Sequence, residues 1–133
     1  MRLFLYGSLL APGALARRSG YPRLPARLCA ATLEGWQRVG QAGSAWPTLR
    51  RARGARTEGA VLDLPAEATR RLSAWEGPDY RLTRVVADTP RGKTAALAWI
   101  APGATDRPWK DPTCSSRHPP SPACGKQTST RPR

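Results

Sequence analysis

The chain has 133 residues, which is enough for one domain with a modest hydrophobic core. Its apolar runs are far shorter than the roughly 18 residues that a membrane-spanning helix needs, and the N-terminal run is too short for a signal peptide, so we expect a cytoplasmic protein with no membrane partner. The net charge of +13 raises nucleic-acid binding as a hypothesis. The arginine clusters, however, are not interleaved with aromatic side chains on which bases stack, so we expect a solvated basic surface and no nucleic-acid partner.

The first half of the chain contains apolar segments separated by turns. Residues 2–6 predict a short buried strand, and residues 12–18 predict a short helix. Residues 28–39 predict a strand, or two strands, with a bend at Gly35. Residues 57–64 predict a further strand, whose apolar contacts come from valine and leucine side chains.

The second half predicts a helix followed by two strands. Ala68, Leu72 and Trp75 lie at helical spacing within residues 66–75, directly after Pro65. Residues 80–88 and 93–100 predict two strands joined by a tight turn. Several short strands with one or two helices indicate an α+β fold with a mixed or barrel-like sheet.

The composition changes near residue 101, where proline, serine, threonine and basic residues become frequent. Such a segment buries too little apolar surface to offset the entropy lost on ordering. We therefore expect one folded domain at residues 1–103 and a mostly disordered, basic, proline-rich tail at residues 104–133. Cys114, His118 and Cys124 within this tail are candidate metal ligands, but a fourth ligand is missing, so we expect no metal site.

The first candidate site follows the N-terminal strand. A glycine at a strand end lets the backbone turn sharply and present its N–H groups, and successive N–H groups hold a carboxylate or another oxyanion. An ordinary strand-ending turn is the alternative interpretation of the same four residues. They are Tyr6, Gly7, Ser8 and Leu9.

The second candidate site follows the predicted helix of residues 66–75. Glu76 lies beside the bulky Trp75 and ahead of a Gly-Pro turn, a place where a carboxylate is held partly out of water and its pKa is raised. A surface glutamate near a helix end is the alternative. The aromatic-proline loop of residues 46–49 is either a pocket wall or ordinary packing.

Together, in this order and spacing, these patterns resemble the γ-glutamylcyclotransferase family, also called AIG2-like. The resemblance covers about residues 2–100. The matching motifs are Tyr6-Gly7-Ser8-Leu9, Gly35-Trp36, Trp46-Pro47, the strand at residues 59–64, and Glu76-Gly77 followed by Tyr80.

The resemblance implies a small mixed β-barrel with flanking helices that uses no cofactor. It implies that the chain is an enzyme that releases 5-oxoproline from a γ-glutamyl amine or peptide, with Glu76 as the general acid/base. The backbone of residues 6–9 would bind the substrate's α-carboxylate, and Tyr80 would line the pocket or orient Glu76. A non-catalytic module of the same fold that binds a small carboxylate is the alternative function, and a basic nucleic-acid binder is a third.

Overall fold

The computed structural model describes residues 1–11, 13–41, 47–101 and 103–108, and ten helices and strands lie within them. In chain order they are β1 (Arg2–Leu5), η1 (Ser8–Leu10), α1 (Ala14–Ser19), η2 (Leu24–Arg27), β2 (Cys29–Gln41), β3 (Pro47–Asp63), α2 (Ala66–Glu76), β4 (Arg81–Thr89), β5 (Gly92–Ile100) and β6 (Ala104–Pro108). No helix in this part of the chain is long and apolar enough to cross a membrane.

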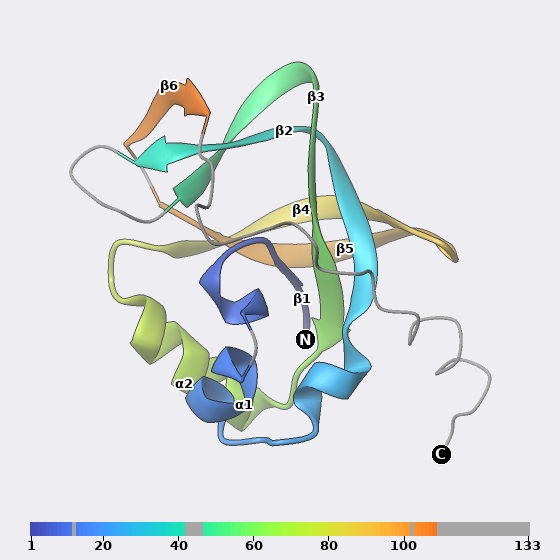
Figure 1. The fold of residues 1–133 in the computed structure, drawn as a ribbon, viewed down its shortest axis with the longest axis vertical. Coiled ribbons are helices and arrows are strands. Elements are labelled where there is room, and N and C mark those ends of the chain that lie inside the picture. The colour runs from blue at the N-terminus through green and yellow to red at the C-terminus, as the bar shows by residue number, and fades with distance from the viewer. Residues whose placement is uncertain (12, 42–46, 102, 109–133) are drawn as a thin grey trace.

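The strands close into a barrel (Figure 1). Their order is β3-β1-β5-β4-β2, and β2 pairs with β3 to complete the circle, while β6 adds to β2 outside it. The pair β1–β5 is parallel and the other pairs are antiparallel. The predicted α+β fold with a small mixed β-barrel and flanking helices is therefore confirmed.

Strand β1 runs through the centre of the hydrophobic core. Leu3, Phe4 and Leu5 are all buried, so both faces of this strand contact other apolar residues. This explains why the strand reads as a continuous apolar run rather than as alternation. Phe4 packs within the barrel, whereas Leu3 and Leu5 pack against the helices.

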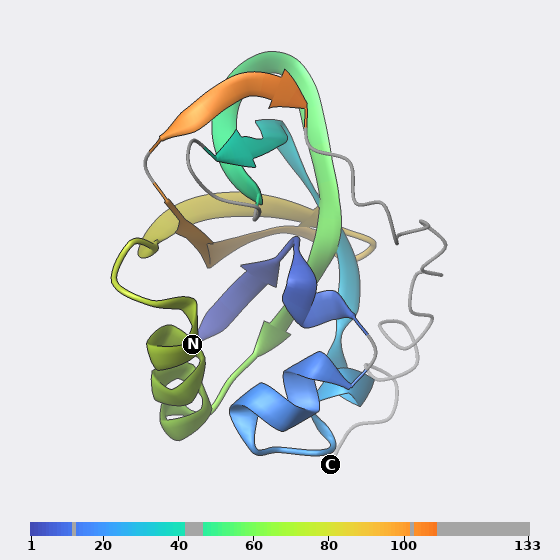
Figure 2. The ribbon, with the colours of Figure 1, turned by 60° about the vertical axis from the view of Figure 1, so that its left-hand side comes forward.

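Helices α1 and α2 lie together against one side of the barrel (Figure 2). Leu15 of α1 and Leu72 of α2 are buried in the same apolar cluster as Leu3 and Leu5. Arg71 donates a hydrogen bond of 3.3 Å to the Ser19 carbonyl, which ties α2 to the last residue of α1. The helices are thus fixed to each other and to β1.

The strand predicted at residues 57–64 is longer in the structure and begins at Pro47. Its first half is rich in arginine and carries no apolar alternation, but it pairs with β2 from Gly40↔Pro47 onward. The predicted bend in β2 is confirmed, because the register shifts between Glu34 and Trp36 and Gly35 has a φ of 85°.

Regular structure continues beyond residue 103, where we expected the folded domain to end. Strand β6 pairs with β2 through Val39↔Pro108 and Gln41↔Ala104, so the proposed tail begins with an ordered strand. Residues 109–133 lie outside the described residues, as do Trp46 and the candidate metal ligands Cys114, His118 and Cys124. The predictions of disorder and of no metal site stay predictions.

Candidate active site

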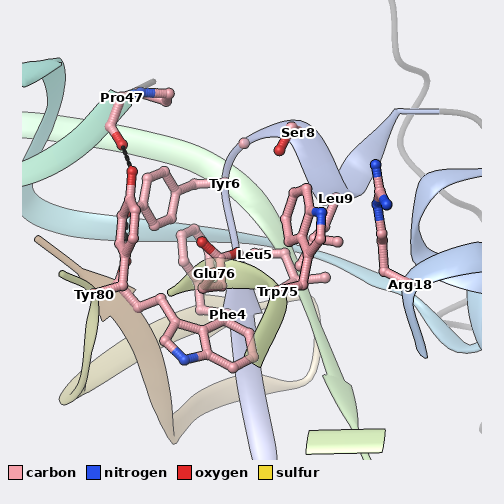
Figure 3. A pocket seen from close by; sticks show the side chains of 12 residues that line it. Phe4, Leu5, Tyr6, Ser8, Leu9, Arg18, Pro47, Trp75, Glu76 and Tyr80 are labelled. Carbon is pink, nitrogen blue, oxygen red and sulfur yellow. Dashed lines mark hydrogen bonds between the residues drawn. The ribbon is translucent and has the colours of Figure 1, made fainter. Parts of the chain in front are cut away.

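A cavity of about 310 Å³ opens between the end of β1, the end of α2 and the start of β3 (Figure 3). It brings together both candidate sites found in the sequence. The described residues that line it are Phe4, Leu5, Tyr6, Gly7, Ser8, Leu9, Arg18, Pro47, Trp75, Glu76, Tyr80 and Trp99.

Residues 6–9 form one wall of the cavity as the turn from β1 into η1. Leu9 is buried in the core and anchors this turn, and the Leu10 N–H donates a 3.0 Å hydrogen bond to the Gly7 carbonyl. The first N–H groups of a helix have no acceptor inside the helix. Ser8 and Leu9 begin η1, so this short helix itself supplies no acceptor for their N–H groups.

Gly7 does not adopt the left-handed conformation that a sharp glycine turn would predict. Its φ is −138°, and a Cβ atom placed there would lie 3.7 Å from Pro47 Cγ, an ordinary contact distance. Gly7 and Pro47 both line the cavity. A side chain at position 7 would therefore contact Pro47 beside the cavity.

Tyr6 is held rigidly at the side of the cavity. Its hydroxyl donates a hydrogen bond to the Trp99 carbonyl, and Arg38 donates one of 2.8 Å to the Tyr6 carbonyl. Loss of hydration and the neighbouring Tyr80 and Glu76 raise the pKa of Tyr6 well above its usual value. Tyr6 therefore stays neutral and acts as a wall.

Glu76 is the last residue of α2, and its carboxylate points into the cavity between Tyr6 and Trp75 (Figure 3). The helix stops there because Gly77 adopts a φ of 93°, and the Gly77 N–H bonds to the Ser73 carbonyl at 3.1 Å. Burial among apolar neighbours raises the Glu76 pKa from 4.5 to about 7. No basic side chain within the described part of the chain forms an ion pair with Glu76.

Tyr80 lines the cavity, but its hydroxyl does not bond to Glu76. It donates to the Pro47 carbonyl at 2.9 Å, and Gln41 Oε1 lies 3.2 Å away (Figure 3). Burial, with Glu76 and Asp79 nearby, raises the Tyr80 pKa to about 12. Of the two roles predicted for Tyr80, the structure therefore favours pocket lining over orientation of Glu76.

The structure adds residues that the sequence analysis missed. Arg18 was included only in the general basic surface, yet it lines the cavity, and its guanidinium carbon lies 4.8 Å from the Trp75 ring centroid. Trp99, on β5, contributes another wall. Neither residue lies in a local motif, because both reach the cavity only through the packing of α1 and β5 around β1. Pro47 fulfils the prediction that the loop of residues 46–49 supplies a wall.

This arrangement has clear chemical capabilities. A carboxyl group with a pKa of about 7 can both accept and release a proton at neutral pH. Among the described lining residues there is no histidine, cysteine or lysine, so Glu76 is the candidate for proton transfer.

A family model described as "Gamma-glutamyl cyclotransferase, AIG2-like" matches residues 3–117. No curated protein matches the chain. A protein from Arabidopsis thaliana solved in solution is 24% identical, with a TM-score of 0.63, covering 79% of this chain and 70% of that one.

Two further solved structures share the fold. A structure titled gamma-glutamyl cyclotransferase is 18% identical, with a TM-score of 0.65 and coverage of 79% and 68%. An AIG2-like protein from Mus musculus is 14% identical, with a TM-score of 0.65 and coverage of 82% and 84%. At these identities the likeness establishes the fold alone.

Proposed function

The chain belongs to the AIG2-like γ-glutamyl cyclotransferase family, and from this premise we propose that it releases 5-oxoproline from a γ-glutamyl compound, with Glu76 as the general acid/base. One observation carries the proposal: the Glu76 carboxyl, with its pKa of about 7, shares a single cavity with the turn of residues 6–9. No cofactor enters the proposed reaction.

The substrate's γ-glutamyl group would be held by its α-carboxylate. The N–H groups of Ser8 and Leu9 would donate to that carboxylate, while Tyr6 and Tyr80 enclose the carbon chain from the side. Binding there places the α-amino group and the γ-carbonyl in the cavity that Glu76 faces. The proposed substrate-binding set is thus Tyr6, Gly7, Ser8, Leu9 and Tyr80.

The proposed reaction is an internal acyl transfer. Glu76 accepts a proton from the α-ammonium group, and the freed amine attacks the γ-carbonyl carbon of the same molecule. A carbon–nitrogen bond closes the five-membered ring, and the bond from the γ-carbon to the leaving nitrogen breaks as Glu76 returns its proton to that nitrogen. The attacking nitrogen gives up a second proton on ring closure, and this proton passes to the released amine, which departs as its ammonium ion. The products are 5-oxoproline and an amine, and no water is consumed.

The pKa values support this transfer. An α-amino group has a pKa of about 8, so a base near 7 takes its proton at little cost and returns it readily. Because nucleophile and electrophile belong to one molecule, the site mainly has to hold the bent conformer. A positioned acid/base contributes about 100- to 10,000-fold in rate, which one carboxyl group supplies.

The test is the identity of the product from γ-glutamyl peptides and γ-glutamyl amines in ¹⁸O-labelled water. The proposal predicts unlabelled 5-oxoproline in equal amount to the released amine. Labelled glutamate would instead show hydrolysis. Tight binding of a γ-glutamyl compound without any product would support the alternative of a non-catalytic binding module. The cytoplasmic location stays a prediction from the sequence.

A further inference from the structure

Arg18 gives the cavity a second charged group. It is the only basic side chain among the described residues that line the cavity, and its ring contact is with Trp75, the residue before Glu76. No carboxylate in the described ranges forms an ion pair with Arg18. Arg18 therefore contacts the Trp75 ring in the cavity wall but has no anionic partner among the described residues.

The backbone at Arg18 is fixed by its neighbours, and the exposed Arg18 side chain contacts the Trp75 ring. Leu15 and Ser19, on the same short helix, are buried, and the Ser19 carbonyl accepts a hydrogen bond from Arg71 of α2. The guanidinium of Arg18 lies over the Trp75 ring, so its face is occupied. The N–H groups at the edge of a guanidinium stay available in this arrangement, and they match a carboxylate in a two-point bond.

The cavity has two distinct sides (Figure 3). Tyr6, Tyr80 and the Pro47 carbonyl lie on one side, and Arg18 lies on the other, with Glu76 and Trp75 between them. In the binding mode proposed above, a γ-glutamyl group against Tyr6 and Tyr80 would present its γ-carbonyl to Glu76. The leaving amine would then extend past Trp75 toward Arg18.

We propose that Arg18 binds a carboxylate carried by the leaving amine, so that the preferred substrates are γ-glutamyl amino acids or peptides rather than γ-glutamyl amines that lack this carboxylate. The apolar ring of Trp75 would pack against the carbon atoms between the scissile bond and the carboxylate. This inference rests on the proposed function, and it assigns Arg18 as a specificity-determining residue with no part in proton transfer.

The test uses γ-glutamyl-L-alanine and γ-glutamylethylamine, which differ only in the carboxylate. The wild-type protein should prefer the first by at least about tenfold in kcat/KM, which is about 1.4 kcal/mol. Arg18→Gln should bring the ratio close to one by lowering turnover of γ-glutamyl-L-alanine alone. Arg18→Lys should keep part of the preference, because it keeps the charge but loses the two-point geometry. Arg17→Gln is the matched control, because it removes the same charge from an exposed neighbour that does not line the cavity.

An equal loss on both compounds in Arg18→Gln would overturn the inference, since Arg18 would then contact the shared γ-glutamyl group. A wild-type ratio near one would overturn it as well. If the wild-type protein cyclises neither compound, the proposed function fails, and calorimetric binding of the same pair becomes the readout. Tighter binding of γ-glutamyl-L-alanine that Arg18→Gln abolishes would then still support the role of Arg18, and equal binding would contradict it.

Discussion

The two ends of helix α2 each carry a glutamate, and their surroundings differ in every respect. Glu67, in the first turn, is solvent-exposed, accepts a 2.8 Å hydrogen bond from Arg71, and lies 3.4 Å from the Tyr21 hydroxyl. Glu76, the last residue, faces a cavity of mostly apolar side chains and pairs with no cation among the described residues.

This difference shows how position in a helix changes the environment of a carboxylate. The N-terminal end of a helix stabilises negative charge, and the C-terminal end disfavours it. Glu67 is solvent-exposed, and its contact with Arg71 helps to hold α2 beside α1. Glu76 lacks these compensations, and burial raises its pKa to about 7.

The largest expected effect is a difference in activity between variants of Glu76 and Glu67. Glu76→Gln keeps the shape of the side chain but removes the proton acceptor, so 5-oxoproline release should fall by at least about 100-fold. Glu67→Gln, the matched control, should change kcat/KM by less than about twofold, because an exposed ion pair contributes little. Steady-state rates of both variants, with circular dichroism to verify folding, provide the measurement. Full activity in Glu76→Gln would contradict the assignment of Glu76, rather than Glu67, as the residue that transfers the proton.

The second prediction concerns stability and pH. The Glu76 pKa is about 7 in the folded protein and 4.5 ordinarily, so between these values the folded state binds more protons than the unfolded state. Its contribution to the free energy of unfolding therefore falls as pH rises from about 4.5 to about 7, by no more than about 3 kcal/mol.

Glu76→Gln has no carboxyl group to titrate, so the variant should not show this fall in the free energy of unfolding as the pH rises. The variant should be more stable than the wild-type protein above pH 7, and the difference should vanish below about pH 4.5. Urea unfolding at several pH values measures it. A wild-type-minus-variant difference that does not depend on pH would show that Glu76 is as solvated as Glu67.

The third prediction tests the wall opposite Glu76. Gly7→Val places methyl groups in the space between Gly7 and Pro47, so KM should rise several-fold with little change in stability. Gly7→Ala should have a smaller effect, because its Cβ reaches only an ordinary contact. Steady-state kinetics of the two variants measure this. Identical kinetics for wild type and Gly7→Val would place the substrate elsewhere.

The smallest effect is expected from replacing the tyrosine near each glutamate, Tyr80 near Glu76 and Tyr21 near Glu67, by phenylalanine. Tyr80→Phe removes a hydrogen bond to the Pro47 carbonyl, worth about 1 kcal/mol of stability, and should lower kcat only a few-fold. Tyr21→Phe, beside Glu67 in the first turn of α2, should leave kcat unchanged. A loss in Tyr80→Phe as large as that of Glu76→Gln would instead assign Tyr80 a direct part in proton transfer.

The sequence allowed the barrel and the core of the site to be predicted where the signal was local. The apolar run of β1, the turn after it and the helix ending at Glu76 each depend on neighbouring residues, and the prediction places them closely. The first half of β3 was missed because its register depends on pairing with β2, which its arginine-rich sequence does not reveal. Strand β6 was missed for the same reason.

The position of Arg18 at the cavity could not be predicted from the sequence, for a different reason. In the sequence it is one arginine among many, and only the packing of α1 on α2 brings it over Trp75. The partial burial of Glu76 was expected from its apolar neighbour Trp75, but the walls that produce it come from distant segments of the chain. Those walls include Pro47 of β3 and Trp99 of β5.

The central claim is that the cavity turns Glu76 into a base at neutral pH. The direct measurement is the ¹³C chemical shift of the Glu76 side-chain carboxyl as a function of pH, with its signal assigned by its loss in Glu76→Gln. The account predicts a midpoint near pH 7. A midpoint near 4.5 would contradict it, because Glu76 would then be an ordinary solvated carboxylate.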